Sequence, residues 1–204
     1  MIVDVEATTS VRQAEVTAAR RMIERTRARF GLWPERLAAD AGYGDAANLA
    51  WLVEEKGIKP HIPVFDKSAR RDGTFERADF FYDPRPFVDE NGLMRYRASK
   101  LDCDACGLKQ RCTPNMPARK ILRSIHEGAR DLARDLALTD AYLTSRRQRK
   151  KVEMLFAHLK RILKLDRLRL RGPNGAKDEF LLAATAQNLR KLAKLIPIPQ
   201  PAPA

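Results

Sequence analysis

The hydrophobic pattern at the start of the chain predicts a strand and then a helix. Residues 2–7 alternate apolar and acidic side chains, which is the period of a half-buried strand. Residues 11–30 place apolar side chains at helical spacing and arginines on the other face, which predicts an amphipathic helix with Ser10 as its N-cap. The apolar stripe of this helix consists of Ala19, Met22, Ile23, Thr26 and Phe30.

A second strand, a helix and a third strand follow in close succession. Residues 36–40 are a short apolar run that ends in Asp40. Asp45 can cap a helix that Gly57 ends, and residues 58–65 are a further strand candidate that two prolines weaken. This order and spacing predict a parallel βαβ unit.

The second half of the chain is predicted to be mainly helical. Helical patterns cover residues 125–138 and 140–165, and a Gly-Pro break at 171–175 precedes a final helix over 176–195. The predicted packing face of that final helix consists of Leu182, Thr185, Leu189 and Leu192.

We therefore expect an α/β chain with four parts. Residues 1–65 are the N-terminal part of the core, and residues 125–195 are its C-terminal helical part. Residues 66–124 sustain no helical period and are rich in proline, glycine and charge, so they are predicted to be an insertion of short strands and loops. The proline-rich residues 196–204 are predicted to be a disordered tail.

The charge balance indicates a nucleic-acid partner. The 204 residues include 39 Lys and Arg against 26 Asp and Glu, a net charge of +13, and a soluble protein this basic usually meets a polyanion. No run approaches the roughly 18 apolar residues of a membrane span. The first ten residues contain acids and lack the basic start of a signal peptide. A cytoplasmic protein that binds nucleic acid, without a membrane partner, is expected.

Asp40 is the first candidate for chemistry. A carboxylate at the C-terminal tip of a buried parallel strand lies where α/β folds place their active sites. The next residues, 41–43, predict a tight turn that would leave this carboxylate exposed. An ordinary strand-end aspartate that starts a turn fits the same pattern, so both interpretations stay open.

Glu153 is the second candidate. Steps of four and seven residues place Glu153 on the same helix face as Arg149 and Lys160. Residues 141–171 contain eleven basic residues and only two acids, and an acid inside a phosphate-binding surface needs another task, such as binding a divalent metal. An ordinary i,i+4 Arg–Glu pair is the alternative. The neighbouring apolar face consists of Val152, Phe156, Leu159 and Leu163.

Three cysteines lie close together, at Cys103, Cys106 and Cys112. The first two have the spacing of a zinc knuckle, but a closed structural zinc site needs four ligands. We weigh a zinc site against three reduced cysteines that pack a small loop. Their odd number and the lack of an export signal disfavour a disulfide framework.

These residues resemble a known family. Residues 37–43, which contain Asp40, resemble the second-aspartate motif of DDE transposases of bacterial insertion sequences, a group with a ribonuclease-H-like fold. Arg149-x3-Glu153-x6-Lys160 resembles the Tyr-x2-Arg-x3-Glu-x6-Lys signature of the same group. Residues 168–172 and 187–189 resemble its closing segments, and the cysteine-containing insertion resembles one branch of it.

The resemblance implies a partial ribonuclease-H-like domain, a mixed sheet flanked by helices, that works in DNA transposition. Asp40 and Glu153 would be the second and third metal-binding carboxylates, for Mg²⁺ or Mn²⁺. The tyrosine of the signature falls at Arg146 here. The implied DNA contacts are Arg146, Arg149, Lys150, Lys160, Arg167, Arg169 and Arg171.

The sequence departs from the family pattern at its front. One strand and one helix precede the Asp40 strand, whereas the family pattern has the first aspartate on an earlier strand, so we expect an N-terminally truncated domain. Asp4 lies on the wrong strand and is not assigned. Three hypotheses follow. The first is part of a transposase that cuts and transfers strands at transposon ends into target DNA, active only when the missing N-terminal part is supplied and a homodimer in the full-length enzyme. The second is an inactive remnant that only binds DNA, and the third is a zinc-dependent nucleic-acid protein.

Overall fold

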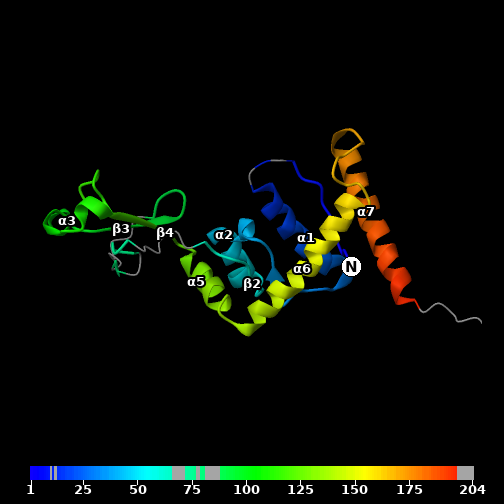
Figure 1. The fold of residues 1–204 in the computed structure, drawn as a ribbon, viewed down its shortest axis with the longest axis horizontal. Coiled ribbons are helices and arrows are strands. Elements are labelled where there is room, and N and C mark those ends of the chain that lie inside the picture. The colour runs from blue at the N-terminus through cyan, green and yellow to red at the C-terminus, as the bar shows by residue number, and fades with distance from the viewer. Residues whose placement is uncertain (10, 12, 66–71, 77–78, 81–87, 197–204) are drawn as a thin grey trace, which may run out of the picture. The chain divides into compact units, whose positions relative to one another are not determined.

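The fold combines helices with two small sheets and divides into two compact units. A computed structural model describes residues 1–9, 11, 13–65, 72–76, 79–80 and 88–196 (Figure 1). Unit 1 consists of Met1–Glu35 and the residues from Leu143 onward, and unit 2 is Arg36–Tyr142. The mixed α/β class is confirmed, while the four-part division of the chain stays a prediction.

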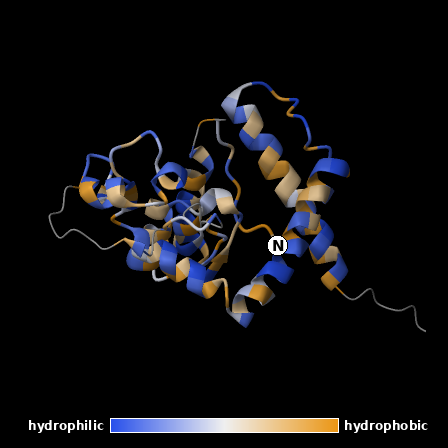
Figure 2. Ribbon diagram, turned by 60° about the vertical axis from the view of Figure 1, so that its left-hand side comes forward, coloured by the Kyte–Doolittle hydropathy of each residue, from blue (hydrophilic) through white to orange (hydrophobic). Residues whose placement is uncertain are grey.

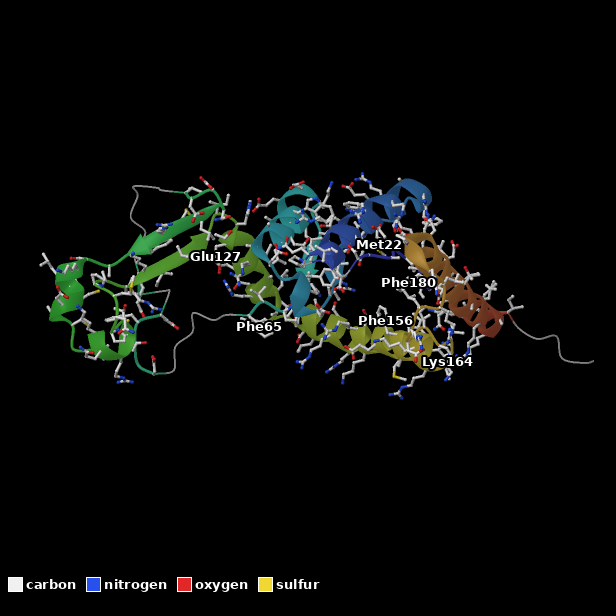
Figure 3. All side chains as sticks on the ribbon, turned by 90° about the horizontal axis from the view of Figure 1, so that it is seen from above. Met22, Phe65, Glu127, Phe156, Lys164 and Phe180 are labelled. Carbon is white, nitrogen blue, oxygen red and sulfur yellow. The ribbon has the colours of Figure 1, made fainter. Side chains whose placement is uncertain are left out.

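Unit 1 is built from three helices, α1 (Ala14–Phe30), most of α6 (Asp140–Arg161) and α7 (Gly172–Leu195). Figure 3 labels Met22 on α1, Phe156 on α6 and Phe180 on α7. Helices α1 and α6 are confirmed, but the predicted apolar face of α6 is not buried as a whole, since Val152 is 47% and Phe156 58% exposed while Leu159 is buried. The proposed cap Ser10 lies outside the described residues, and α1 begins after Gln13.

The predicted final helix over residues 176–195 is confirmed, but its predicted start is wrong. α7 already begins at Gly172, with Pro173 in its first turn. Proline is favoured there because its missing N–H would have no intrahelical partner and its φ suits the helix. Gly172 has a φ of +76°, so the Gly-Pro pair forms the entry to α7 and does not interrupt it.

The predicted strand at residues 2–7 is also wrong. This segment is extended without a strand partner, and side chains hold it in place. The Asn188 side chain accepts from the Ile2 amide at 2.8 Å and donates to the Ile2 carbonyl at 2.7 Å. Arg25 bonds Asp4 at 2.7 Å, and the Arg21 hydrogen bond lowers the pKa of Glu6. The alternating acids Asp4 and Glu6 therefore form ion pairs with arginines of α1.

The predicted packing face of α7 is not buried in the described part of unit 1. Leu182 is 67% exposed and Leu189 is 60% exposed, whereas Ala183, Ala184 and Gln187 are buried. Figure 2 shows hydrophobic and hydrophilic residues mixed along the helices. The face of α7 that carries the two alanines is buried, and the face that carries the leucines is exposed to solvent. No helix in the described ranges is long and apolar enough to cross a membrane.

The parallel βαβ unit is confirmed in unit 2. Strand β1 (Arg36–Ala38) pairs in parallel with β2 (Lys59–His61), in a register that places Leu37 opposite Pro60. The connection contains the 3₁₀ turn η1 (Ala41–Tyr43), helix α2 (Ala46–Ala50) and a wider last turn η2 (Trp51–Glu55).

The cap and the stop of this connecting helix are as predicted. The Asp45 carboxylate accepts from the Asn48 amide at 2.9 Å, and Gly57 takes a φ of +65° directly after the helix. The side chains of Leu49, Leu52, Ile58 and Ile62 are fully buried and form the core of unit 2.

The segment before residue 125 contains short strands, as expected, and two short helices that were not. Strand β3 (Leu93–Arg97) pairs antiparallel with β4 (Lys120–Ser124). Helices α3 (Lys100–Ala105) and α4 (Lys109–Cys112) lie between them in the chain. That this segment is an insertion stays a prediction.

A buried carboxylate holds two arginines of its own helix, α5 (Glu127–Leu136). Glu127 is 4% exposed and bonds Arg134 at 3.0 Å and Arg130 at 3.4 Å (Figure 3). Arg130 also donates to the Phe65 carbonyl at 3.2 Å. Although burial acts to lower the pKa of Arg134, its bonds to Glu127 and Asp131 raise it overall.

Removal of the buried Glu127 carboxylate is expected to destabilise unit 2. Glu127→Ala leaves two largely buried guanidinium groups without this partner, which costs about 3 kcal/mol or more. Asp131→Ala is the control, because Asp131 is 39% exposed and exposed pairs contribute about 1 kcal/mol or less. Urea unfolding of both variants checks the ranking, and equal losses would contradict it.

Acid is expected to destabilise unit 2 through His61. Burial, with the positive charges of Arg36 and Lys59, lowers the pKa of His61 below its usual value of about 6.5. When the pH is above this usual value, the imidazole is neutral in both the folded and the unfolded chain. Below it the unfolded chain binds the proton more readily, so stability falls as the pH drops toward the folded-state pKa.

The His61→Gln variant should lose less unfolding free energy than the parent between pH 7 and pH 5. Its urea unfolding at both pH values is the measurement. An unchanged pH dependence would show that other groups cause it.

Candidate active site and basic surface

Asp40 is separated from β1 by one residue, and its side chain is exposed. The predicted burial of this strand is wrong, since Arg36 and Ala38 are exposed. Asp40 caps the 3₁₀ turn η1, with Oδ1 accepting from the Gly42 amide at 2.8 Å. One carboxylate oxygen thus fixes the turn. This geometry satisfies the interpretation as a turn-starting aspartate and leaves oxygen available for a ligand.

The turn after Asp40 is held tightly in unit 2. The buried Asn48 side chain donates to the Tyr43 carbonyl at 2.9 Å. A Cβ at Gly44 would lie 2.9 Å from the Pro63 carbonyl oxygen, so only glycine fits there without a shift. No sequence pattern predicts the Asn48 contact, because it depends on how α2 faces the turn that precedes it.

Glu153 is on the surface of α6 and not in an apolar core. Its side chain is 61% exposed, and its Oε1 lies 3.4 Å from Arg149 Nε. The predicted i,i+4 pair therefore exists, at a distance longer than a strong charge-assisted bond. An exposed carboxylate in a loose pair stays available to another ligand.

Glu153 is surrounded by basic residues that have few acidic partners. Of the eleven basic residues between 146 and 171, Arg149 alone forms an ion pair within the described residues. Six of the seven predicted DNA contacts are exposed, and Arg149 is half-buried. The exposed six are Arg146, Lys150, Lys160, Arg167, Arg169 and Arg171. Such a surface is typical of proteins that handle a polyanion.

Glu179 of α7 anchors the segment that carries the last three of these arginines. Its Oε1 accepts hydrogen bonds from the backbone amides of both Arg169 and Leu170. Just after α6, Lys164 takes a φ of +56°, a left-handed conformation that turns the chain (Figure 3 labels this residue). The sequence analysis missed Glu179, because a helix-surface acid carries no local sign of a contact ten residues earlier.

Loss of the Glu179 carboxylate is expected to loosen residues 167–171. Glu179→Ala removes two charge-assisted bonds, so the Arg169 and Leu170 amides should exchange about tenfold faster, which corresponds to about 1.4 kcal/mol. Hydrogen exchange followed by mass spectrometry is the measurement. The neighbouring exposed acid provides a control in Asp178→Ala, and equal acceleration in both variants would rule out the anchoring role.

The three cysteines are half-buried free thiols that line one pocket of about 460 Å³ in unit 2. The pocket wall also includes Phe75 and Phe80. Among the described residues, no three His, Cys, Asp or Glu side chains gather at a point where they could hold a metal ion. The zinc hypothesis therefore gains no geometric support.

The same finding bears on a catalytic metal. Carboxylate oxygens are the ligands that Mg²⁺ prefers, and Asp40 and Glu153 both expose them. Asp40 belongs to unit 2 and Glu153 to unit 1, so each carboxylate is considered only with the residues of its own unit. Two separate carboxylates do not fit a complete metal centre by themselves, so the pairing of Asp40 with Glu153 stays a prediction.

A comparison with protein families identifies the class. Residues 86–193, more than half of the chain, match a family model described as a transposase DDE domain. The chain therefore belongs to the transposase DDE domain family, as its motifs predicted. The match includes Glu153, the cysteines and all seven predicted DNA contacts, whereas Asp40 precedes it. Searches of curated proteins and of solved structures gave no significant match.

Proposed function

We propose that this chain forms part of the catalytic domain of an insertion-sequence transposase that cleaves and transfers DNA strands at transposon ends. The family match over residues 86–193 implies transposition, and the observation that carries the catalytic assignment is the exposed Glu153 carboxylate on a basic helix inside that match. We further propose that the domain is ribonuclease-H-like, with Asp40 at the end of its strand as a second catalytic carboxylate.

The basic residues have a separate task in this proposal. Phosphodiester groups of a transposon end would lie along Lys150, Lys160 and the arginines of residues 167–171, where few acids compete for the cations. Arg149 would hold the Glu153 carboxylate in orientation. A divalent metal, Mg²⁺ or Mn²⁺, supplies activation of the attacking oxygen and charge stabilisation in such reactions.

The alternative function is DNA binding without cleavage. It is favoured by the basic stretch over residues 146–171, where ten of eleven cations have no acidic partner among the described residues. The basic surface would still bind the phosphate backbone, because that attraction needs no metal. DNA is the partner in both the catalytic proposal and the binding-only alternative. Only the catalytic proposal includes a homodimer of the full-length enzyme.

Substitution of either carboxylate tests the catalytic proposal. A labelled duplex that carries the transposon end is incubated with the chain and Mg²⁺ or Mn²⁺, and nicked product is measured. Asp40→Asn and Glu153→Gln should each reduce nicking by more than the roughly 10–100-fold typical of an outer-shell partner of a metal. Chelation should abolish it.

The Asp166→Asn variant is the matched control, because Asp166 is the other acid of the same basic stretch and is exposed. It should nick like the parent. Glu153→Gln should bind the duplex at least as tightly as the parent, since it loses a negative charge beside phosphate. Parent protein that binds the duplex but never nicks it would establish the binding-only alternative.

A further inference from the structure

A groove between α6 and α7 in unit 1 has a chemistry that the proposed active site does not use. It has a volume of about 570 Å³, and its lining is mostly apolar, with Met154, Leu155 and Ile162 among its side chains. Five cations line it, and no acidic side chain does so in the described part of the unit. These cations are Lys151, Arg161, Arg190, Lys191 and Lys194.

The groove is distinct from the surface that carries Glu153. None of its five cations belongs to the seven predicted DNA contacts. Lys151 and Glu153 are two residues apart on α6, which separates them by about 200° around the helix. On α7, Gln187, Arg190 and Lys194 recur at steps of three and four residues, so they share one face.

Two residues that line the groove have buried polar atoms without a hydrogen-bond partner among the described residues. Gln187 is 8% exposed, and its Oε1 has no hydrogen-bond partner in the described residues. Both ring nitrogens of His158 are shielded from solvent and equally without a partner there. Folded proteins rarely leave such groups unbonded, because each loses its water on burial. Here an acceptor and an imidazole line a groove that is rimmed with positive charge.

The ligand that fits this combination has phosphates at one edge and flat, hydrogen-bonding groups at the other. A single DNA strand offers both, since its phosphates can meet the cations while an unstacked base enters the apolar groove. The amide of Gln187 and the ring nitrogens of His158 can bond a base edge, and the imidazole can stack on a base. A duplex keeps its bases paired and cannot present them in this way.

We propose that the α6–α7 groove binds a single-stranded DNA segment, with His158 and Gln187 contacting a base and Arg190 and Lys194 contacting phosphates. The choice of DNA depends on the transposase function proposed above, whereas the binding itself needs neither metal nor cleavage. The two can therefore fail separately, and equilibrium binding in the presence of a chelator tests the groove alone.

The first experiment measures fluorescence anisotropy of a short oligothymidylate and of a matched duplex with the full chain. The double variant Arg190→Ala/Lys194→Ala should bind the oligothymidylate about tenfold more weakly, with a salt dependence shallower by roughly 1.4, since each lost phosphate contact on a single strand accounts for about 0.7. Its duplex affinity should change much less.

Two matched variants make this result specific. Lys177→Ala removes an exposed cation of α7 that does not line the groove, and it should bind like the parent. Arg167→Ala/Arg169→Ala should weaken the duplex more than the single strand. Equal losses of both DNA forms in the groove variant, or no loss, would overturn the proposal. So would competition by polyglutamate as strong as that by the oligothymidylate.

The second experiment separates a ligand contact from a structural role. His158→Phe keeps a ring and Gln187→Met keeps the length, but each removes the unbonded polar atoms. Both variants should bind the oligothymidylate more weakly while their melting temperatures stay equal to or above that of the parent. Lower melting temperatures with unchanged affinity would mean that these side chains serve the fold, and the proposal would fail.

Discussion

Repulsion among the basic residues of α6 and of the segment that follows is the constraint on which this molecule depends. Ten of the eleven cations between residues 146 and 171 have no acidic partner within the described residues. Like charges at such spacing oppose the compact state. The acids are used sparingly: Glu179 binds two backbone amides, and Glu153 pairs loosely with Arg149. A surface with this excess of positive charge favours the binding of an external anion.

The carboxylates also differ in how fully the fold engages them. Glu127 is buried between two arginines, and Asp4 and Glu6 are bonded to α1, so these three acids maintain the fold. Asp40 and Glu153 are exposed and only partly engaged. The two acids that the family resemblance predicts for chemistry are thus among those that the fold leaves exposed.

Local patterns predicted the elements whose causes are local. The periods of α1 and α6, the Asp45 cap and the Gly57 stop each depend on neighbouring residues, and all are present. The strand at residues 2–7 failed because a strand needs a partner, which an alternating pattern cannot supply. Asp40 and Glu153 could be picked out from the sequence by their places after a strand and on a basic helix. No sequence pattern predicts the Glu179 contact, or the placement of His158 and Gln187 in one groove, because both depend on tertiary packing.

The division of the chain into units has a consequence for the order of folding. Unit 2 is one continuous segment, Arg36–Tyr142, whereas unit 1 joins the two ends of the described chain. The bonds between Ile2 and Asn188 span 186 positions. Contacts this distant form slowly, and a ribosome adds about 5–20 residues per second, so unit 2 can be complete seconds before α7 exists. Until α7 emerges, Asp4 can already pair with Arg25 of α1, but Ile2 still lacks its two bonds to Asn188.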